Sequence, residues 1–170
     1  MNRLDIITKD TFEYFGSAFP DFVKDRLGEE GLMLFGFTKS GKPCGGCAVS
    51  FDPAESELIW FVISEEDRSE GLATELLFRL MYRLSELGSE SLGCEFPSDT
   101  PDTFTRLLKQ YGAVFEELPD QEIEGKPGES FSSRYARIDL RPYLPYHEMM
   151  YENLLLTGVI DPKEEISLEE

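Results

Sequence analysis

The chain has 170 residues, enough for one domain with a sizeable core, and 41% of them are hydrophobic, which excludes a disordered protein. Its 34 acidic and 16 basic side chains leave a formal net charge of -18, which disfavours nucleic-acid binding and favours a cationic or amine partner. No apolar run is long enough for a membrane span and the first residues form no secretory signal, so we expect a cytoplasmic protein. Three cysteines and one histidine, His147, are too few for a disulfide framework or a metal centre, so we expect no metal.

The first half of the chain predicts an antiparallel sheet and two short helices. Apolar spacing predicts a helix from residue 10 or 11 onward, which Pro20 divides because proline removes a helix hydrogen bond. Strands are expected at residues 4–8, 32–38, 44–51 and 57–63. The last of these is apolar nearly throughout, as a central strand would be.

The second half predicts two helices that alternate with strands. The longest helix, residues 70–87, carries one apolar stripe and ends at Gly88. We expect further elements in the order strand 91–96, helix 102–111, strand 113–118 and strand 131–140, with a polar loop at 119–130. The composition changes after residue 140, so residues 1–140 form the expected domain and 141–170 a C-terminal helical extension with an acidic tail.

Two short motifs of the first half are weaker candidates for function. Residues 36–43 have the G-x-x-x-x-G-K frame of a phosphate-binding loop, but Pro43 replaces the required hydroxyl and a strand follows, so we expect a hairpin turn. Cys44 and Cys47 form a C-x-x-C motif on an expected strand, where residues three apart face opposite sides of the sheet. A redox pair opens a helix, so these cysteines are more simply core thiols.

The connection between strand 58–63 and the long helix carries the most informative motif. A strand that runs into a helix whose first turn contains a glycine exposes unpaired backbone N–H groups at the positive end of the helix dipole. Gly71 allows phosphates to approach that backbone, and Arg68 supplies a positive charge at the rim. The same pattern also fits an ordinary amphipathic helix with a glycine at its start.

The motif Arg68-x-x-Gly71-x-Ala73 resembles the R/Q-x-x-G-x-G/A signature of GNAT superfamily acyltransferases, and the order of elements over residues 2–140 is similar to the GNAT core. The resemblance implies an α+β, GNAT-like acyl-CoA N-acyltransferase fold: a central mixed, mostly antiparallel sheet with helices on both faces. It also implies a V-shaped slot where strand 58–63 splays from strand 91–96. Acetyl-CoA, the implied co-substrate, would pair with the backbone of Phe61 and Ile63 and bind through Arg68, Ser69, Glu70, Gly71, Leu72, Ala73 and Thr74.

The implied activity is N-acetyl transfer, in which a primary amine of a small molecule or peptide attacks the thioester directly. The candidate bases are Glu95 and Glu57, and the Ile63 N–H would polarise the carbonyl. Leu108 occupies the place where the family often has a tyrosine that protonates the leaving thiolate. Tyr111, three residues further on, is therefore the candidate acid.

Other readings stay open at this point. Because the usual tyrosine is missing, a GNAT-like domain that binds acyl-CoA or a protein partner without turnover is one alternative, and an α+β interaction domain without a cofactor is another. Tyr135 and Arg137 alternate on the last strand and are expected on the acceptor side. The aromatic-rich C-terminal segment would cover the acceptor site, fold back on its own sheet, or form a homodimer.

Overall fold

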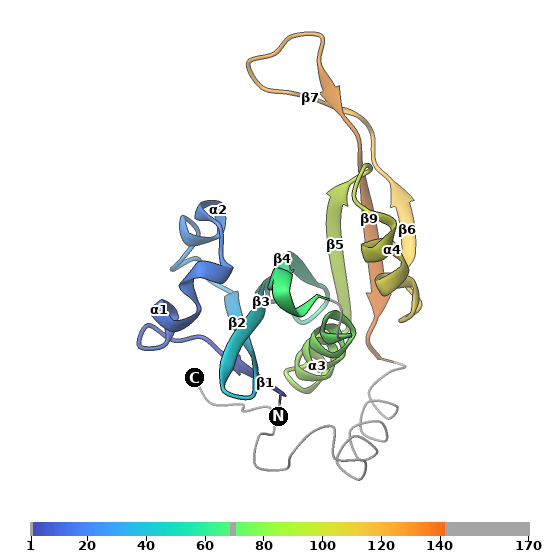
Figure 1. Ribbon diagram of the computed structural model, residues 1–170. Helices are drawn as coiled ribbons and strands as arrows, with labels where there is room; N and C mark the ends of the chain where they lie inside the picture. The colour runs from blue at the N-terminus through green and yellow to red at the C-terminus, as the bar shows by residue number, and fades with distance from the viewer. Residues whose placement is uncertain (1, 69–70, 142–170) are drawn as a thin grey trace.

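A seven-stranded sheet is the centre of the computed structural model, which describes residues 2–68 and 71–141 (Figure 1). Neighbouring strands are antiparallel except β4 and β5, which are parallel, so the predicted mixed, mostly antiparallel sheet is confirmed. In spatial order the strands are β1 Asn2–Ile6, β2 Leu32–Lys39, β3 Lys42–Ser50, β4 Ser56–Ile63, β5 Ser91–Pro97, β9 Ser133–Asp139 and β6 Val114–Glu117.

Helices cover both faces of this sheet, as predicted. On one face lie α3 (Leu72–Glu86) and α4 (Asp102–Lys109), whose apolar stripes pack on the larger core cluster. On the other lie α1 (Phe12–Phe15), the short 3-10 helix η1 (Gly16–Ala18) and α2 (Asp21–Lys24), which bury the smaller cluster. The predicted break at Pro20 is confirmed, because Pro20 precedes the first residue of α2.

The β2–β3 hairpin contains both of the weaker motifs of the first half and shows the structure that each adopts. Ser40 and Gly41 both have positive φ, the backbone that a tight two-residue hairpin requires, so residues 36–43 form a turn and not a phosphate loop. The expectation that Cys44 and Cys47 face opposite sides is wrong. A register shift makes Cys44 an extra residue of β3, and both thiols are buried in the core cluster beneath α3.

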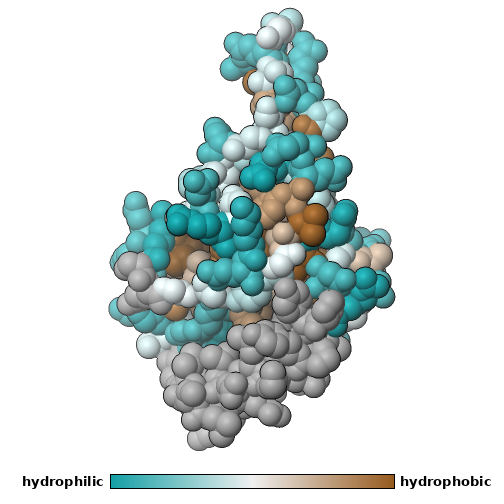
Figure 2. Space-filling view, turned by 90° about the vertical axis from the view of Figure 1, so that its right-hand side faces the viewer, coloured by the Kyte–Doolittle hydropathy of each residue, from teal (hydrophilic) through white to brown (hydrophobic). Residues whose placement is uncertain are grey.

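The segment between β6 and β9 differs from the prediction of a plain loop. It contains a second small sheet, β7 (Gln121–Glu122) paired with β8 (Ser130–Phe131), which projects as an arm beyond the end of the main sheet (Figure 1). Figure 2 shows the face that lies on the right-hand side of Figure 1. Its described part is mainly hydrophilic, with apolar side chains gathered near the centre, below the arm. In the segments that the structure describes, no helix has the length and apolar character needed to cross a membrane.

Two predictions concern residues outside the described segments. The predicted helical extension covers 141–170, of which the structure describes only Arg141. Ser69 and Glu70, two of the predicted phosphate-binding residues, also lie outside the described residues.

Candidate functional site

Strands β4 and β5 separate after a short paired stretch. Only Ser56 and Glu57 of β4 pair with β5, opposite Leu92 and Gly93. Immediately beyond, Ile59 is an extra residue against β3, since Leu58 and Trp60 pair with consecutive residues of that strand. A bulge bends its strand and ends regular pairing, and the two strands accordingly diverge (Figure 1). The V-shaped slot that the resemblance implied is present.

A cavity of about 300 Å³ occupies the slot. Both strands line it, together with α2 and the start of α4, and five of its eleven lining residues are aromatic. The aromatic lining residues are Phe22, Trp60, Phe61, Phe96 and Phe104. The latter three form one cluster of ring contacts, with centroid distances of 6.4 Å for Phe61–Phe104 and 5.5 Å for Phe96–Phe104.

The backbone of β4 presents alternate peptide groups to this slot. The Ser64 N–H donates to the Cys44 carbonyl at 2.7 Å, and in an antiparallel ladder every second residue makes such bonds. Phe61 and Ile63 therefore direct their peptide groups away from β3, toward the side where β5 has diverged. The Ile63 carbonyl confirms this direction, because it accepts a hydrogen bond from Arg68 Nε at 2.9 Å.

The start of α3 follows Arg68 closely in sequence, with the N-cap three residues further on. Gly71 is the N-cap in a left-handed conformation (φ 73°), and among the described residues no side chain caps this end. A Cβ at Gly71 would meet no atom of the described residues within 4 Å, so none of them crowds this position. The N–H groups of Leu72, Ala73 and Thr74 are the ones that helix geometry leaves without internal partners, and such groups bind anions.

The two candidate catalytic residues occupy different places. Glu95 is exposed on β5 and lines the cavity. Tyr111 is 9% exposed just after α4, where its hydroxyl donates to the Thr74 carbonyl of α3 at 3.3 Å, and it is not among the residues that line the cavity. Leu108 is part of the core. The structure thus brings Glu95, but not Tyr111, to the slot.

Cys94 is the one cysteine that lines the slot cavity, and its environment suppresses its reactivity. Its side chain is buried and contributes to the cavity lining. Burial, with smaller contributions from the negative charges of Glu57 and Glu95, raises the pKa of the Cys94 thiol to about 12. The thiolate that a covalent mechanism needs is therefore scarce near neutral pH.

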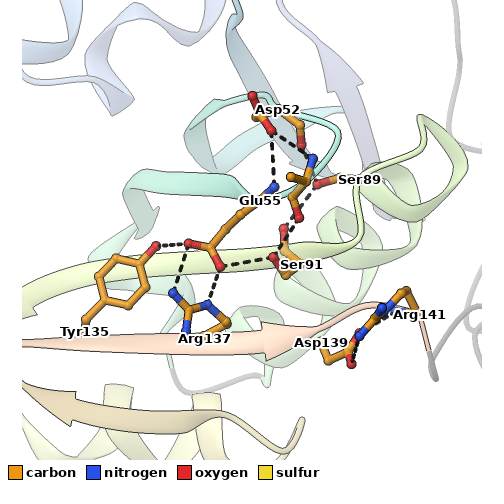
Figure 3. A network of polar contacts seen from close by, with 9 residues as sticks. Asp52, Glu55, Ser89, Ser91, Tyr135, Arg137, Asp139 and Arg141 are labelled. Atoms are coloured by element: carbon orange, nitrogen blue, oxygen red, sulfur yellow. Dashed lines mark hydrogen bonds and ion pairs between the residues drawn. The ribbon is translucent and has the colours of Figure 1, made fainter.

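A polar network closes the narrow end of the slot (Figure 3). Glu55, in the turn before β4, reaches across β5 and accepts hydrogen bonds from Tyr135 Oη at 2.6 Å, from Ser91 Oγ at 3.1 Å and from the Arg137 guanidinium. The bond from Arg137 is the main reason that the pKa of Glu55 is lowered. Burial first, and then the bond to Glu55, raise the pKa of Tyr135.

Sequence reasoning expected Tyr135 and Arg137 near the acceptor side but missed Glu55 as their partner. Gly93 is the local signal that was available. A glycine inside a strand often marks a close approach, and a Cβ at Gly93 would collide with the Tyr135 ring that lies over it.

The fold matches those of solved acetyltransferases, although no family model matches the chain and a search of curated protein sequences gave no match. The ribosomal-protein-S18-alanine N-acetyltransferase of Escherichia coli aligns with a TM-score of 0.64 at 17% identity, over 82% of this chain and 94% of that one. Spermidine N-acetyltransferase of Vibrio cholerae, solved with CoA and spermine, aligns with a TM-score of 0.66 at 14% identity, over 84% and 98%. An acetyltransferase of Bacillus subtilis in complex with CoA aligns at 0.61 and 13% identity, over 82% and 99%.

These likenesses define the class of fold. The protein has the GNAT acyl-CoA N-acyltransferase fold. The described residues contain the mixed sheet, the diverging strands β4 and β5, and helix α3 with Gly71 as its N-cap.

Proposed function

We propose that this protein is an N-acetyltransferase that moves an acetyl group from acetyl-CoA to a primary amine of a small molecule or peptide. The observation that carries the proposal is the divergence of β4 from β5 just before the N-terminus of α3. Along the chain, the diverging part of β4 ends at Ile63, Arg68 donates to the Ile63 carbonyl, and α3 begins after Gly71 with no cap from a described side chain. The free edge of β4 can pair with the arm that carries a thioester, and the N-terminus of α3 can bind a pyrophosphate.

Residues of β4 and α3 hold the co-substrate in this proposal. The peptide groups of Phe61 and Ile63 pair with the pantetheine arm as an added strand would. The N–H groups from Ser69 to Thr74 bind the pyrophosphate, and Gly71 leaves room for it. Arg68 donates its Nε–H to the Ile63 carbonyl, and in this proposal its Nη groups bind a phosphate oxygen.

Glu95 acts as the general base at the acceptor side of the slot. Its carboxylate takes the proton of the arriving ammonium group, and the neutral nitrogen attacks the acetyl carbonyl carbon while the Ile63 N–H stabilises the developing oxyanion. The N–C bond forms as the C–S bond breaks, and the leaving thiolate takes up a proton. The net reaction converts one ammonium group and one thioester into one amide, one free thiol and one released proton.

Direct attack is favoured over a covalent acetyl-enzyme. A two-step route needs a nucleophile at the slot, and the raised pKa of Cys94 makes its thiol a poor one. Cys44 and Cys47 are buried in the core, and burial also raises the pKa of Cys47.

Tyr111 stays a prediction as the acid that protonates the thiolate. Tyr111→Phe tests it. If Tyr111 is the acid, kcat falls while the Kd for acetyl-CoA is unchanged. If its hydroxyl only joins α4 to the Thr74 carbonyl, the midpoint of thermal unfolding falls and kcat at low temperature does not.

Calorimetric titration of acetyl-CoA tests the proposed function as a whole. We expect the wild-type protein to bind, and Gly71→Asp to bind at least about tenfold more weakly, because a carboxylate would face the pyrophosphate. Gly125→Asp is the matched control: Gly125 has a similar positive φ of 78° and equally open surroundings, but lies at the turn of the β7–β8 arm.

Turnover is then measured as free thiol released in the presence of amines. Binding without release by any amine would support the non-catalytic alternative. Equal binding by wild type and Gly71→Asp would refute the phosphate site at α3.

A further inference from the structure

The part of the slot lining that α2 contributes is an exposed aromatic side chain. Phe22, on α2, is 51% exposed and lies edge-on against Trp60, with 5.8 Å between ring centroids and an interplanar angle of 83°. Both rings line the slot cavity. An apolar side chain left this exposed at the mouth of a cavity is typical of a surface that a ligand covers.

Trp60 is held in place and connects two cavities. Its indole Nε1–H donates to the Ala18 carbonyl at 2.8 Å, so the ring is fixed relative to η1. Beside the slot cavity, Trp60 lines a second cavity of about 320 Å³ under η1, whose other walls include Phe15, Phe19 and Val62 and which reaches Ile63. Phe22 and Trp60 therefore form an apolar side of the slot, and the cavity beyond Trp60, which has both apolar and polar walls, extends to Ile63.

Charge is sparse along this surface. Of the described residues that line the two cavities, Glu95 is the only carboxylate, and Arg68 at the far end is the only cation. A polyamine bound here would place one ammonium group beside Glu95, and its other ammonium groups would meet no second carboxylate among the described residues that line the two cavities. A ligand with one amine and one apolar group has a partner for both.

We propose that the acceptor is a monoamine whose carbon skeleton carries an aromatic or similarly bulky apolar group. The ammonium group is received by Glu95, and the apolar group packs against Phe22 and Trp60. This inference rests on the proposed acetyl-transfer function and adds the chemical class of its acceptor. It separates this slot from that of a polyamine acetyltransferase, although the overall fold is shared with one.

The test compares three amines with the full-length protein and saturating acetyl-CoA. The probes are 2-phenylethylamine, ethylamine and spermidine, and the readout is kcat/KM from free thiol release. We expect 2-phenylethylamine to exceed each of the others by at least about tenfold, the effect that burying a ring's worth of apolar surface produces in specificity. A higher kcat/KM for spermidine would overturn the inference.

Phe22→Ala identifies the surface responsible. It should raise the KM for 2-phenylethylamine about tenfold and change the KM for ethylamine much less. Phe131→Ala is the matched control, since Phe131 is also an exposed aromatic residue (42%) but lies on the β7–β8 arm. Equal losses for both amines in Phe22→Ala would contradict a specific contact.

Trp60 is the only tryptophan of the chain, so its fluorescence measures binding independently of turnover. We expect 2-phenylethylamine to change this fluorescence in the wild type and, at the same concentration, much less in Phe22→Ala. If acetyl-CoA binds by calorimetry but 2-phenylethylamine gives neither a fluorescence change nor turnover, the acceptor class is wrong. If acetyl-CoA does not bind, the proposed function fails, and the fluorescence titration still decides whether the slot accepts an apolar amine.

Discussion

Gly93→Ala should disrupt the network at the narrow end of the slot. A Cβ at Gly93 would lie 2.5 Å from Tyr135 Cζ and closer still to its hydroxyl, where an ordinary contact is 3.4–4 Å. The strand backbone accepts alanine, so the Tyr135 ring must swing away, and Glu55 loses the hydrogen bond at 2.6 Å. A hydrogen bond to a charged group contributes roughly 1.5–3 kcal/mol, and replacing a strand glycine by alanine returns roughly 0.5–1 kcal/mol.

The expected net loss is about 1–2 kcal/mol in the free energy of unfolding, which lowers Tm by roughly 3–6 °C for a chain of this length. Urea unfolding of a double-mutant cycle with Tyr135→Ala isolates the cause. Once the ring is absent, Gly93→Ala should be neutral or slightly stabilising. If Gly93→Ala costs the same in both backgrounds, the collision with Tyr135 is not the reason for the loss and the argument fails.

Four further predictions follow from the site and its supports. Glu95→Gln should lower kcat by about 10²–10⁴ without changing acetyl-CoA affinity, whereas Glu57→Gln should cost less than about tenfold; similar losses would contradict Glu95 as the base. Cys94→Ala should leave kcat within about threefold and keep intersecting initial-rate lines; parallel lines would indicate a covalent intermediate. Glu75→Ala should lower the free energy of urea unfolding by about 3 kcal/mol, because the 2%-exposed Arg79 side chain loses its 3.0 Å ion pair with Glu75. The control is Glu29→Ala, which removes the exposed ion pair with Arg26 and should cost under about 1 kcal/mol. The pKa of Glu55 is lowered in the folded protein, so its ionised form stabilises the fold above about pH 4.5 and this contribution disappears as the pH falls. The small Tm difference between wild type and Glu55→Gln should therefore shrink from pH 7 to pH 3. A constant Tm difference would contradict this.

Local patterns predicted the elements of the fold, because each rests on interactions between residues close in sequence. The apolar stripe of α3, the break at Pro20 and the hairpin at Ser40 and Gly41 depend on helix periodicity or on backbone dihedral preferences. The Arg68–Gly71 motif belongs to the same class, since a strand, a turn and a helix start are adjacent in the chain. The open helix end at Gly71 was therefore predictable from sequence, although its use is a proposal.

The parts that were missed depend on which strands become neighbours. Ile59 and Cys44 are extra residues only relative to their partner strands, so no local pattern distinguishes them from ordinary strand residues. The partnership of Glu55 with Tyr135 joins residues 80 positions apart and needs the β5–β9 register first. The bond from the Tyr111 hydroxyl to the Thr74 carbonyl likewise joins residues far apart in sequence, while the role of Tyr111 as the acid stays a prediction.

Net charge and cavity lining give different information about the acceptor. The charge of -18 acts through solvent over about 8–10 Å and raises the local concentration of every cation, most strongly that of a polyamine, but it does not determine which amine fits the slot. Discrimination requires contact, where desolvation of each ammonium group is weighed against the partner it meets. The slot offers Glu95 and the rings of Phe22 and Trp60 at that range. An acidic protein with a GNAT fold therefore need not act on polycations, because its surface charge attracts the substrate and its slot selects it.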